Sequence, residues 1–214
     1  MGTPLFIVFE GIDGAGTTTQ SQRLAEYVRE LGHQVVLTRE PGGTPLAERI
    51  RALVLEPTEE EMVFTTELLL YSAGRAQHVG GVIAPSLAAG TPVICDRFTY
   101  STLAYQGYGR QLDLQMIETL NDMACGGTAP DLTIFMELSE AEAVNRRSQR
   151  DGSSDRIEAE GDEFLGRVQR GYAQLARESE RASIAVDSAP DVDTVGARIK
   201  EEVTSRWPGF PYRA

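Results

Sequence analysis

The sequence predicts an α/β fold in which a five-stranded parallel sheet carries helices on both faces. Short apolar runs alternate with longer segments of helical periodicity along the 214 residues. The apolar runs are continuous, as in strands that are buried on both faces of a parallel sheet. A glycine-rich stretch over 10–20 separates the first apolar run from the first helical segment, in the strand–loop–helix order of a phosphate-binding loop.

The first half of the chain supplies three of the expected strands, over residues 5–9, 34–38 and 92–95. A helix over 18–31 stops at Gly32, which favours the left-handed conformation of a helix end. Thr44 caps a helix that begins at Pro45. The segment 59–89 has a helical pattern, and we expect Gly80-Gly81 to break it into two helices.

The second half supplies the remaining elements. Strands are expected over 132–138 and 183–187. Helices are expected over 98–105, 113–124, 139–150, 162–178 and 192–207. Ser139 and Glu142 have the spacing of a capping box at the start of the third of these helices. The tail 208–214 predicts no particular structure, and we interpret residues 1–214 as a single domain.

Composition limits the classes of partner. The net charge of −12 argues against a nucleic-acid polymer, because binding a phosphate backbone needs a basic surface. Lys200 is the only lysine, so a phosphate site must rely on arginine, backbone amides or a metal ion. No apolar run is long enough to span a membrane, and Cys95 and Cys125 form no disulfide framework or metal motif, so we expect a cytoplasmic protein that does not bind membranes. His33 and His78 show no metal or catalytic partner in the sequence.

The glycine-rich stretch matches the phosphate-loop pattern G-x-x-x-x-G-K-[ST] at every position except one. Gly11 and Gly16 allow the backbone to turn tightly and approach an anion, and the helix that follows directs amides and a favourable dipole at it. Thr18 supplies the hydroxyl of the pattern, whereas Thr17 stands where the pattern has lysine. The loop therefore lacks the cation that normally reaches the terminal phosphates.

Charged residues follow three of the expected strands, at Glu10-Gly11, Arg39-Glu40 and Asp96-Arg97. Because ligands of such sheets bind beyond the carboxyl ends of the strands, we expect these residues to meet in one cleft.

Taken together, the motifs resemble those of thymidylate kinase, a family of P-loop nucleoside monophosphate kinases. The resemblance rests on collinear segments over nearly the whole chain: residues 10–20, 39–44, 67–71 with Arg75, 96–98, 101–107, 130–133 and 155–158. It implies the P-loop NTPase fold and transfer of the γ-phosphoryl group of ATP to dTMP, giving dTDP, with Mg²⁺. It also implies a homodimer formed through helices on one side of the sheet, and the apolar residues of the 59–89 segment are compatible with this.

On the donor side, the resemblance assigns ATP binding to the loop and to one arginine beyond it: Gly11, Ile12, Asp13, Gly14, Ala15, Gly16, Thr17, Thr18 and Arg147. Thr18 and Asp96 are the expected magnesium residues, Asp96 acting through water.

On the acceptor side, the resemblance assigns dTMP binding to Asp13, Arg39, Tyr71, Arg75, Arg97, Thr102, Tyr105 and Gln106. Arg39 anchors the phosphate, Tyr71 stacks on thymine, and Tyr105 crowds the sugar 2′ position. Arg75 and Thr102 read the base, Gln106 lies near it, and Asp13 lies near the 3′-hydroxyl. From the residues alone, an aromatic on a helix such as Tyr71 is more often a core residue, and only the resemblance favours stacking on the base. For Arg39, a surface residue paired with Glu40 is the less favoured alternative to a phosphate anchor.

The expected catalytic residues are Asp96, Arg97 and Arg150. We expect Arg97 to span the donor and acceptor phosphates. Family members with glycine in the middle of the loop, as Gly14 is here, carry a catalytic arginine on a lid that closes over ATP. We place this lid at about 147–158, where Arg146, Arg147, Arg150 and Arg156 flank a Gly-Ser turn. Asp151 stands where the family usually has an arginine, and Arg150 next to it is the expected substitute.

Thr17 leaves three interpretations. The first is an active kinase in which Arg97, a lid arginine and Mg²⁺ supply the missing charge. The second is a nucleotide-binding protein with weak or no catalysis, and the third is a kinase for another monophosphate. We favour the first, because the acceptor and lid motifs remain, and because Tyr71, Arg75, Thr102 and Tyr105 agree with thymidylate recognition.

Overall fold

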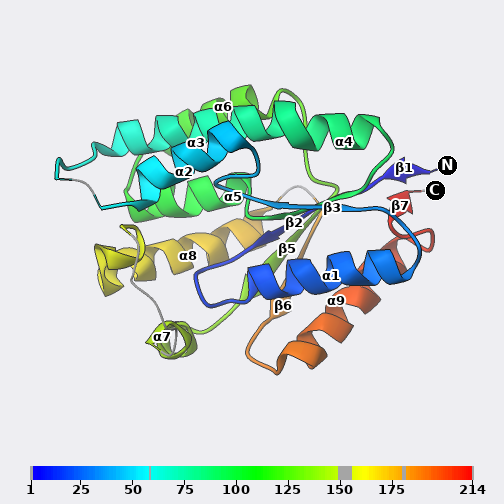
Figure 1. Ribbon diagram of the computed structural model, residues 1–214. Coiled ribbons are helices and arrows are strands. Elements are labelled where there is room, and N and C mark those ends of the chain that lie inside the picture. Colours follow the sequence, from blue (N-terminus) through cyan, green and yellow to red (C-terminus); the bar gives the residue numbers. More distant parts are fainter. Residues whose placement is uncertain (1, 58, 149–155, 180–181, 214) are drawn as a thin grey trace.

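The computed structural model describes residues 2–57, 59–148, 156–179 and 182–213 (Figure 1). Its main sheet has five parallel strands in the order β3-β4-β2-β5-β6, which confirms the predicted sheet. The strands are β2 (Phe6–Glu10), β3 (Val36–Arg39), β4 (Val93–Asp96), β5 (Leu132–Glu137) and β6 (Ser183–Asp187).

The central strand β2 is buried along its whole length. Its apolar side chains contact helices on both faces, because alternate residues point to opposite sides of the sheet. Phe9 belongs to the cluster shared with α1 (Thr17–Glu30) and α9 (Val192–Arg206), whereas Val8 belongs to the cluster on the other face. The loop after β2 therefore begins at the middle of the sheet edge.

The helices form a layer on each face of the sheet (Figure 1). Helices α1 and α9 lie on one side, and α3 (Phe64–His78), α4 (Ala84–Ala88) and α6 (Leu114–Cys125) lie on the other. The remaining helices and turns are α2 (Pro45–Leu55), α5 (Thr99–Thr102), α7 (Glu140–Ser148), α8 (Asp162–Glu178), the 3₁₀ turn η3 (Glu158–Glu160) and the π-helical segments η1 (Val79–Ile83) and η2 (Leu103–Gly109).

Several helix boundaries have the causes that the sequence predicts. Thr44 Oγ1 accepts a hydrogen bond from Ala47 N at 3.1 Å, and Pro45 opens α2. Gly32 has a φ of 83° just beyond the end of α1. Ser139 Oγ accepts from Glu142 N at 3.3 Å before α7. These side chains and glycines satisfy or redirect backbone groups that the helix ends leave unpaired.

The predicted break at Gly80-Gly81 is wrong. These residues belong to η1, a wide helical turn that joins α3 to α4 without interruption from Phe64 to Ala88. Val79 and Ile83 are buried against the sheet, so tertiary packing outweighs the low helix propensity of glycine. The segment also begins at Phe64 and not at residue 59.

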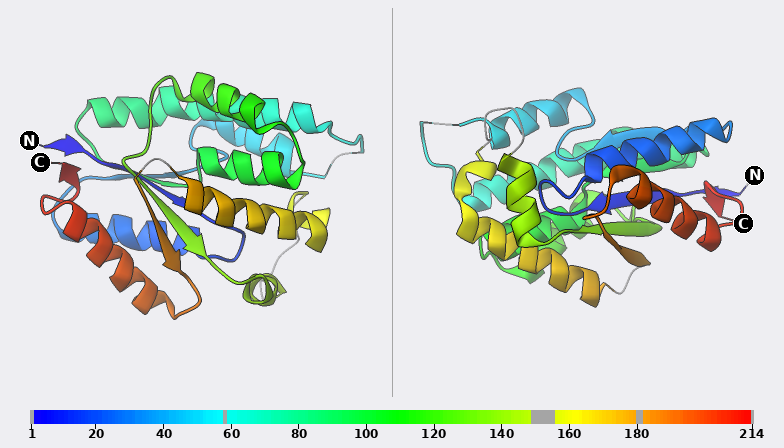
Figure 2. Two further views of the ribbon diagram at one scale, coloured as in Figure 1. Left: turned by 180° about the vertical axis from the view of Figure 1, so that it is seen from behind. Right: turned by 90° about the horizontal axis from the view of Figure 1, so that it is seen from below.

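Two further elements differ from the sequence expectation. The helix expected over 98–105 becomes α5 followed by the π-helical η2. The tail contributes β7 (Tyr212–Arg213), which pairs antiparallel with β1 (Thr3–Pro4). Figure 2 shows the two ends of the chain side by side at this small sheet. Across the described ranges, no helix combines the length and apolar character needed to cross a membrane.

Candidate functional site

The carboxyl ends of β2, β3 and β4 meet, as the sequence predicts. Arg97 N donates a hydrogen bond to Phe9 O at 2.8 Å, and Glu40 N donates to Asp96 O at 2.9 Å. The residues that follow these three strands therefore lie around one edge of the sheet.

The loop between β2 and α1 has the geometry of an anion cradle. Gly14 and Gly16 have φ angles of 94° and 87°, which side-chain-bearing residues rarely adopt. At Gly11, a Cβ atom would lie 2.9 Å from Met136 O, so only glycine fits against β5. Gly16 is the cap residue of α1 and offers no side-chain acceptor, which leaves the first amides of the helix for an anion.

Two oxygen-bearing side chains meet beside the loop. Thr18 Oγ1 donates a hydrogen bond to Asp96 Oδ2. Asp96 is 7% exposed, and its other oxygen, Oδ1, is buried without a hydrogen-bond partner among the described residues. A buried carboxylate oxygen of this kind favours a cation or a bound water.

Thr17 opens α1 and is 5% exposed. Arg97 and Arg146 donate hydrogen bonds to the loop. Arg97 Nη2 donates to Asp13 Oδ1 at 2.7 Å, and Arg146 Nη1 donates to Gly14 O at 3.4 Å. The loop therefore has a guanidinium at each of two adjacent residues, although position 17 is uncharged.

Arg97 is held from several sides. Its φ is 70°, and its guanidinium contacts Tyr172 Oη at 3.1 Å as well as Asp13. Glu10 fixes the backbone around it, because Glu10 Oε1 accepts from Phe98 N at 2.9 Å and from Ser101 N at 3.2 Å. Glu10 Oε2 accepts from Tyr172 Oη at 3.2 Å. Arg97 thus has a fixed position between the loop and the neighbouring cavity.

Burial changes the titration of groups around Arg97. It raises the pKa of the Glu10 carboxyl above its ordinary value, although the Ser101 hydrogen bond and the Arg97 charge act in the opposite direction. Burial also raises the pKa of the Tyr105 and Tyr172 phenols well above the ordinary value. Both phenols therefore stay protonated near neutral pH, and Tyr105 Oη donates to Asp13 Oδ2 at 2.6 Å.

A cavity of about 110 Å³ opens beside Arg97. Seven of the eight residues predicted to bind dTMP line it: Asp13, Tyr71, Arg75, Arg97, Thr102, Tyr105 and Gln106. The exception is Arg39.

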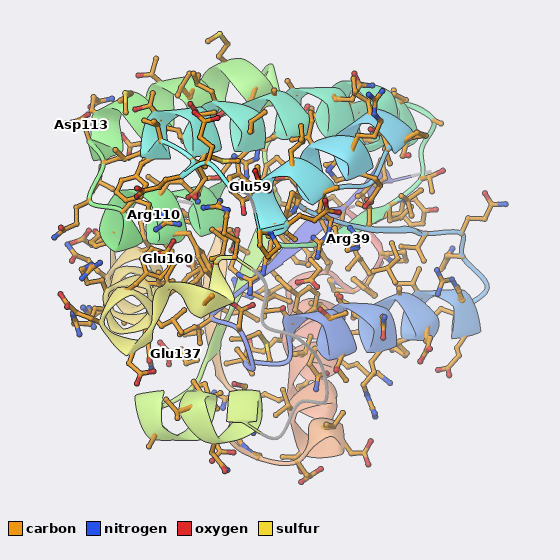
Figure 3. The ribbon with its side chains drawn as sticks, turned by 60° about the vertical axis from the view of Figure 1, so that its left-hand side comes forward. Arg39, Glu59, Arg110, Asp113, Glu137 and Glu160 are labelled. Atoms are coloured by element: carbon orange, nitrogen blue, oxygen red, sulfur yellow. The ribbon has the colours of Figure 1, made fainter. Side chains whose placement is uncertain are left out.

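Arg39 is exposed at the end of β3 (Figure 3). It pairs with Glu48 Oε2 at 3.1 Å, and not with Glu40 as the alternative interpretation had it. Arg51 on α2 lines the cavity and donates to Pro41 O at 2.9 Å. Arg51 was not predicted as a site residue; its place on the helix that follows the glycine loop 41–43 was the available signal.

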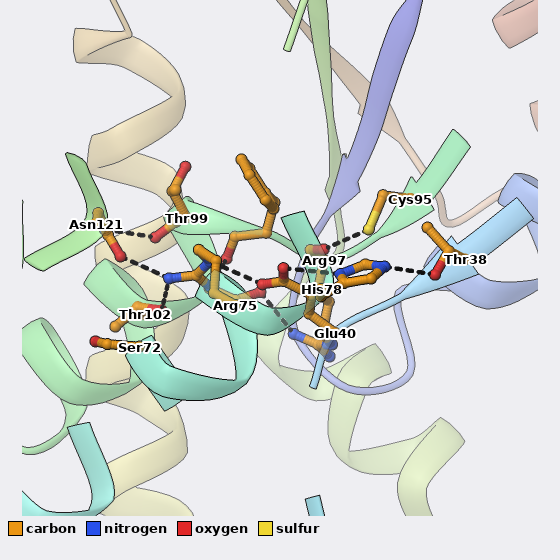
Figure 4. A network of polar contacts seen from close by, with 12 residues as sticks. Thr38, Glu40, Ser72, Arg75, His78, Cys95, Arg97, Thr99, Thr102 and Asn121 are labelled. Carbon is orange, nitrogen blue, oxygen red and sulfur yellow. Dashed lines mark hydrogen bonds and ion pairs between the residues drawn. The ribbon is translucent and has the colours of Figure 1, made fainter. Parts of the chain in front are cut away.

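Arg75 lies at the centre of a buried polar network (Figure 4). Its Nε donates to Glu40 Oε2 at 2.8 Å, and its Nη2 donates to Phe98 O at 2.8 Å. Its Nη1 donates to Thr102 Oγ1 at 2.9 Å and to Asn121 Oδ1 at 2.6 Å. Four of the five N–H groups of this guanidinium are thus used within the described residues, which leaves one Nη2 N–H for a ligand.

His78 extends this network, although the sequence shows no partner for it. It is fully buried at the end of α3, with Nδ1 3.0 Å from Glu40 Oε1 and Nε2 2.7 Å from Thr38 Oγ1. Figure 4 shows the resulting chain from Thr38 through His78 and Glu40 to Arg75. These contacts join residues up to 40 positions apart, which no local pattern reveals.

The predicted lid residues are only partly described. Arg150 and Asp151 lie outside the described residues, and of Arg147 only the backbone in α7 is described. Arg156 lies against the acceptor side of the site: its Nη2 is 2.6 Å from Glu67 Oε2, and its Nε donates to Val54 O at 2.8 Å.

A second cavity, of about 430 Å³, borders the other side of the loop. Its walls include Gly16 and Gln20 and a segment after β6, residues 188–192. Arg146 reaches this segment, donating to Ser188 O at 2.9 Å. The 188–192 segment was not predicted as part of the site, although it follows a strand end and contains Pro190. The loop thus lies between two cavities, each large enough for part of a nucleotide.

The chain is similar to several known proteins. The family model described as thymidylate kinase matches residues 9–199. A thymidylate kinase of Geobacter sulfurreducens is 46% identical over 208 residues, covering 95% of this chain and 98% of that protein. A thymidylate kinase of a Nostoc species is 47% identical over 197 residues, covering 92% of this chain and 93% of that protein.

A solved structure is also similar. The crystal structure of thymidylate kinase from Ehrlichia chaffeensis superposes with a TM-score of 0.74 at 35% sequence identity. The match covers 93% of this chain and 98% of the other.

Proposed function

This chain belongs to the thymidylate kinase family, and we propose that it transfers the γ-phosphoryl group of ATP to dTMP, giving ADP and dTDP. The enzyme class, a nucleoside monophosphate kinase, follows from the family. What we propose beyond the family is that ATP is the phosphoryl donor, which residues bind each substrate, and how Thr17 affects catalysis.

The single observation that carries the proposal is the position of Arg97. Its guanidinium contacts Asp13 in the loop while its side chain lines the smaller cavity. A cation at this junction neutralises charge on both a donor phosphate held by the loop and an acceptor phosphate in the cavity.

Donor binding is proposed for the loop, whose residues 11–18 receive the phosphates at the start of α1, and for the larger cavity, which receives the base. Arg146 lines that cavity and supplies positive charge beside Gly14. Arg147 and Arg150 stay predictions for the donor side.

Acceptor binding is proposed for the smaller cavity. The remaining Nη2 N–H of Arg75 can donate a hydrogen bond to a carbonyl oxygen of thymine. The amino group of cytosine is itself a donor, so it cannot accept this hydrogen bond. Tyr105 and its partner Asp13 border the sugar, Tyr71 faces the base, and Arg39 with Arg51 supplies positive charge for the phosphate.

Magnesium is proposed at Thr18 and Asp96, and the residues present fit it. Both supply hard oxygen atoms, and the unpaired, buried Oδ1 of Asp96 is the atom that such a site requires. A magnesium ion held by these two residues would neutralise phosphate charge and orient the donor phosphates.

The proposed reaction needs no strong base, because the attacking phosphate oxygen of dTMP is already anionic near pH 7. The protein aligns this oxygen with the γ-phosphorus, and Arg97 stabilises the charge of the transferring group. The two hydrogen bonds that Arg97 donates to Asp13 and Tyr172 keep its guanidinium in place, so little reorganisation accompanies the transfer.

A coupled ADP-release assay with ATP, Mg²⁺ and a panel of nucleoside monophosphates tests this function. We expect turnover with dTMP, and turnover at least about 100-fold lower with dCMP, because the buried donor of Arg75 would then lack an acceptor. Equal turnover with dCMP, or preference for another monophosphate, would contradict the assignment.

The alternative is a nucleotide-binding protein with weak or no catalysis. The buried, uncharged Thr17 in place of the loop lysine is the observation that favours it. Calorimetry separates the two: the alternative predicts binding of both ATP and dTMP without turnover.

We also propose a homodimer, as the family resemblance implies. Leu53 on α2, Leu69 on α3 and Met123 on α6 are 56%, 50% and 71% exposed on the helical layer that covers one face. Sedimentation analysis of the purified protein measures the state directly, and a monomer at assay concentration would contradict this proposal. A cytoplasmic location stays a prediction.

A further inference from the structure

A fully buried carboxylate, Glu67 in the first turn of α3, gathers three side chains behind the acceptor cavity. Its Oε1 accepts from Gln106 Nε2 at 2.9 Å and from Arg110 Nε at 3.2 Å. Its Oε2 accepts from Arg110 Nη2 at 3.0 Å and from Arg156 Nη2 at 2.6 Å. The partners come from η2, from its C-terminal end and from the segment before η3.

Arg110 makes this arrangement rigid. Its guanidinium lies between the rings of Phe64 and Phe164, 4.6 and 4.7 Å from their centroids. It also pairs with Glu160 at 2.6 Å (Figure 3). Glu160 is exposed at the edge of this cluster, whereas Glu67 and Arg110 form a buried ion pair at 3.0 Å, as a buried charge requires. Burial alone would raise the pKa of Glu67, but the hydrogen bonds from Arg110 and Gln106 outweigh it and lower this pKa, so Glu67 is ionised at neutral pH.

Arg156 connects Glu67 to the end of α2. Its backbone N donates to Leu55 O at 3.0 Å, and its Nε donates to Val54 O at 2.8 Å. The same arginine therefore satisfies carbonyls at the C-terminus of α2 and one oxygen of a carboxylate on α3.

Glu67 itself does not line the acceptor cavity, but residues that are hydrogen-bonded to it, or connected to it through Arg156, do. Gln106 lines the cavity from η2, and Leu55 and Ile157 line it from the α2 end and from the residue after Arg156. One buried charge thus holds two walls of the cavity that are far apart in sequence.

We propose that Glu67 is a positioning residue for the acceptor nucleotide, which acts through Gln106 on one wall of the cavity and through Arg156, Leu55 and Ile157 on the other. This inference rests on the proposed function, which assigns the cavity to dTMP. It predicts that loss of the Glu67 charge loosens both walls and weakens dTMP binding. The donor loop lies between β2 and α1 and has no described contact with Glu67, so ATP binding is unaffected.

Four variants test the inference: Glu67→Gln, Arg156→Gln, the double variant and Glu160→Gln. Glu160→Gln is the matched control, because it removes a carboxylate partner of Arg110 that touches neither Glu67 nor the cavity. The measurements are KM for dTMP, KM for ATP and kcat, together with dTMP binding by calorimetry and the melting temperature of each variant.

We expect Glu67→Gln and Arg156→Gln each to raise KM and Kd for dTMP about tenfold, with KM for ATP changed less than about twofold. The double variant is expected to match Glu67→Gln, because that single change already removes the contact through which Arg156 is coupled to the carboxylate. Glu160→Gln is expected to keep the wild-type KM for dTMP. A purely structural role would lower the melting temperature without this difference between the substrates.

Unchanged dTMP binding in folded Glu67→Gln, or equal changes for dTMP and ATP, would overturn the inference alone, because wild-type binding would still support the proposed function. Failure of the wild-type protein to bind dTMP would overturn both. If Glu67→Gln does not fold, Arg156→Gln carries the same test, since the Arg156 side chain is 15% exposed at the edge of the cluster.

Discussion

At the scale of one residue, Thr17 leaves the phosphate loop without a positive charge at the position where the pattern has lysine. It opens α1 at the position where the phosphate-loop pattern has lysine, and Arg97 and Arg146 donate hydrogen bonds to Asp13 and Gly14 of the same loop. If these arginines replace the charge of the lysine, a cation at position 17 adds a further positive charge to a catalytically active loop. If they do not, the cation restores the positive charge that the terminal phosphates lack.

Thr17→Lys is therefore expected to leave kcat equal to or higher than that of the wild type in the ADP-release assay. Thr17→Met is the control, because methionine extends the side chain without charge and is not expected to raise kcat. A large loss of activity in Thr17→Lys would show that the loop is built around threonine.

Arg97 is the residue with the largest predicted effect. Arg97→Ala is expected to lower kcat by about 10³- to 10⁵-fold, the range seen when an arginine that stabilises phosphoryl transfer is absent. The melting temperature and kcat should be compared with those of Arg198→Ala, an exposed arginine on α9. Residual activity within tenfold of the wild type would rule out the proposed role of Arg97.

At the scale of elements, the loop 39–44 depends on close backbone packing. Gly43 has a φ of 87°, and a Cβ atom there would lie 2.4 Å from the buried His78 ring and 2.8 Å from Thr38 Oγ1. Because His78 is hydrogen-bonded on both sides, it cannot easily move away. The same contacts position Glu40, which holds Arg75.

Gly43→Ala is expected to lower the free energy of unfolding by about 2–4 kcal/mol, combining left-handed strain with overpacking. Gly90→Ala is the matched control: Gly90 has a φ of 80° with no atom within 4 Å of its Cβ position, so only about 1 kcal/mol of strain is expected. Equal losses in the two variants, measured by urea denaturation, would show that contact with His78 is unimportant.

The elements also show what the sequence could predict. The five strands and most helix boundaries follow from periodicity and capping residues such as Thr44, because these signals are local. The π-helical turns η1 and η2 do not, since they depend on burial of Val79 and Ile83 and on packing of η2 against α8. Local rules overestimated the effect of Gly80 and Gly81.

In the candidate site too, residues in local motifs could be predicted, whereas contacts between distant parts of the chain could not. Seven of the eight residues that the motifs predict for the acceptor side, Arg97 among them, line one cavity, and their roles there stay predictions. Glu67 lies inside one of these motifs, but its role could not be predicted, because its ion pair with Arg156 joins residues 89 positions apart. The partners of His78 and the 188–192 wall also depend on how distant strands and helices come together.

At the scale of the whole molecule, the terminal sheet lies away from the site. Leu5 N donates to Pro211 O at 3.1 Å, and Phe210 is 7% exposed, with its ring 6.2 Å from that of Tyr27 on α1. These contacts are at the amino ends of the strands, whereas the loop and both cavities are at the carboxyl ends. A substitution near the terminal sheet is therefore expected to change the free energy of unfolding without changing substrate binding.

Phe210→Ala is expected to lower the free energy of unfolding by about 3–5 kcal/mol through loss of burial and the cavity left behind. KM for dTMP at a temperature where the variant is folded should stay at the wild-type value. Denaturation and kinetics of the same preparation check both statements, and a raised KM in folded protein would contradict the separation of the terminal sheet from the site.

The most direct test of the central claim is ³¹P NMR of the wild-type protein with ATP, dTMP and Mg²⁺. It distinguishes transfer to dTMP from hydrolysis, because dTDP and inorganic phosphate give separate signals. We predict that dTDP and ADP accumulate together in equal amounts, with Thr17 in place. Binding of both nucleotides without dTDP, or release of inorganic phosphate in its place, would contradict the claim that this loop and Arg97 carry out phosphoryl transfer.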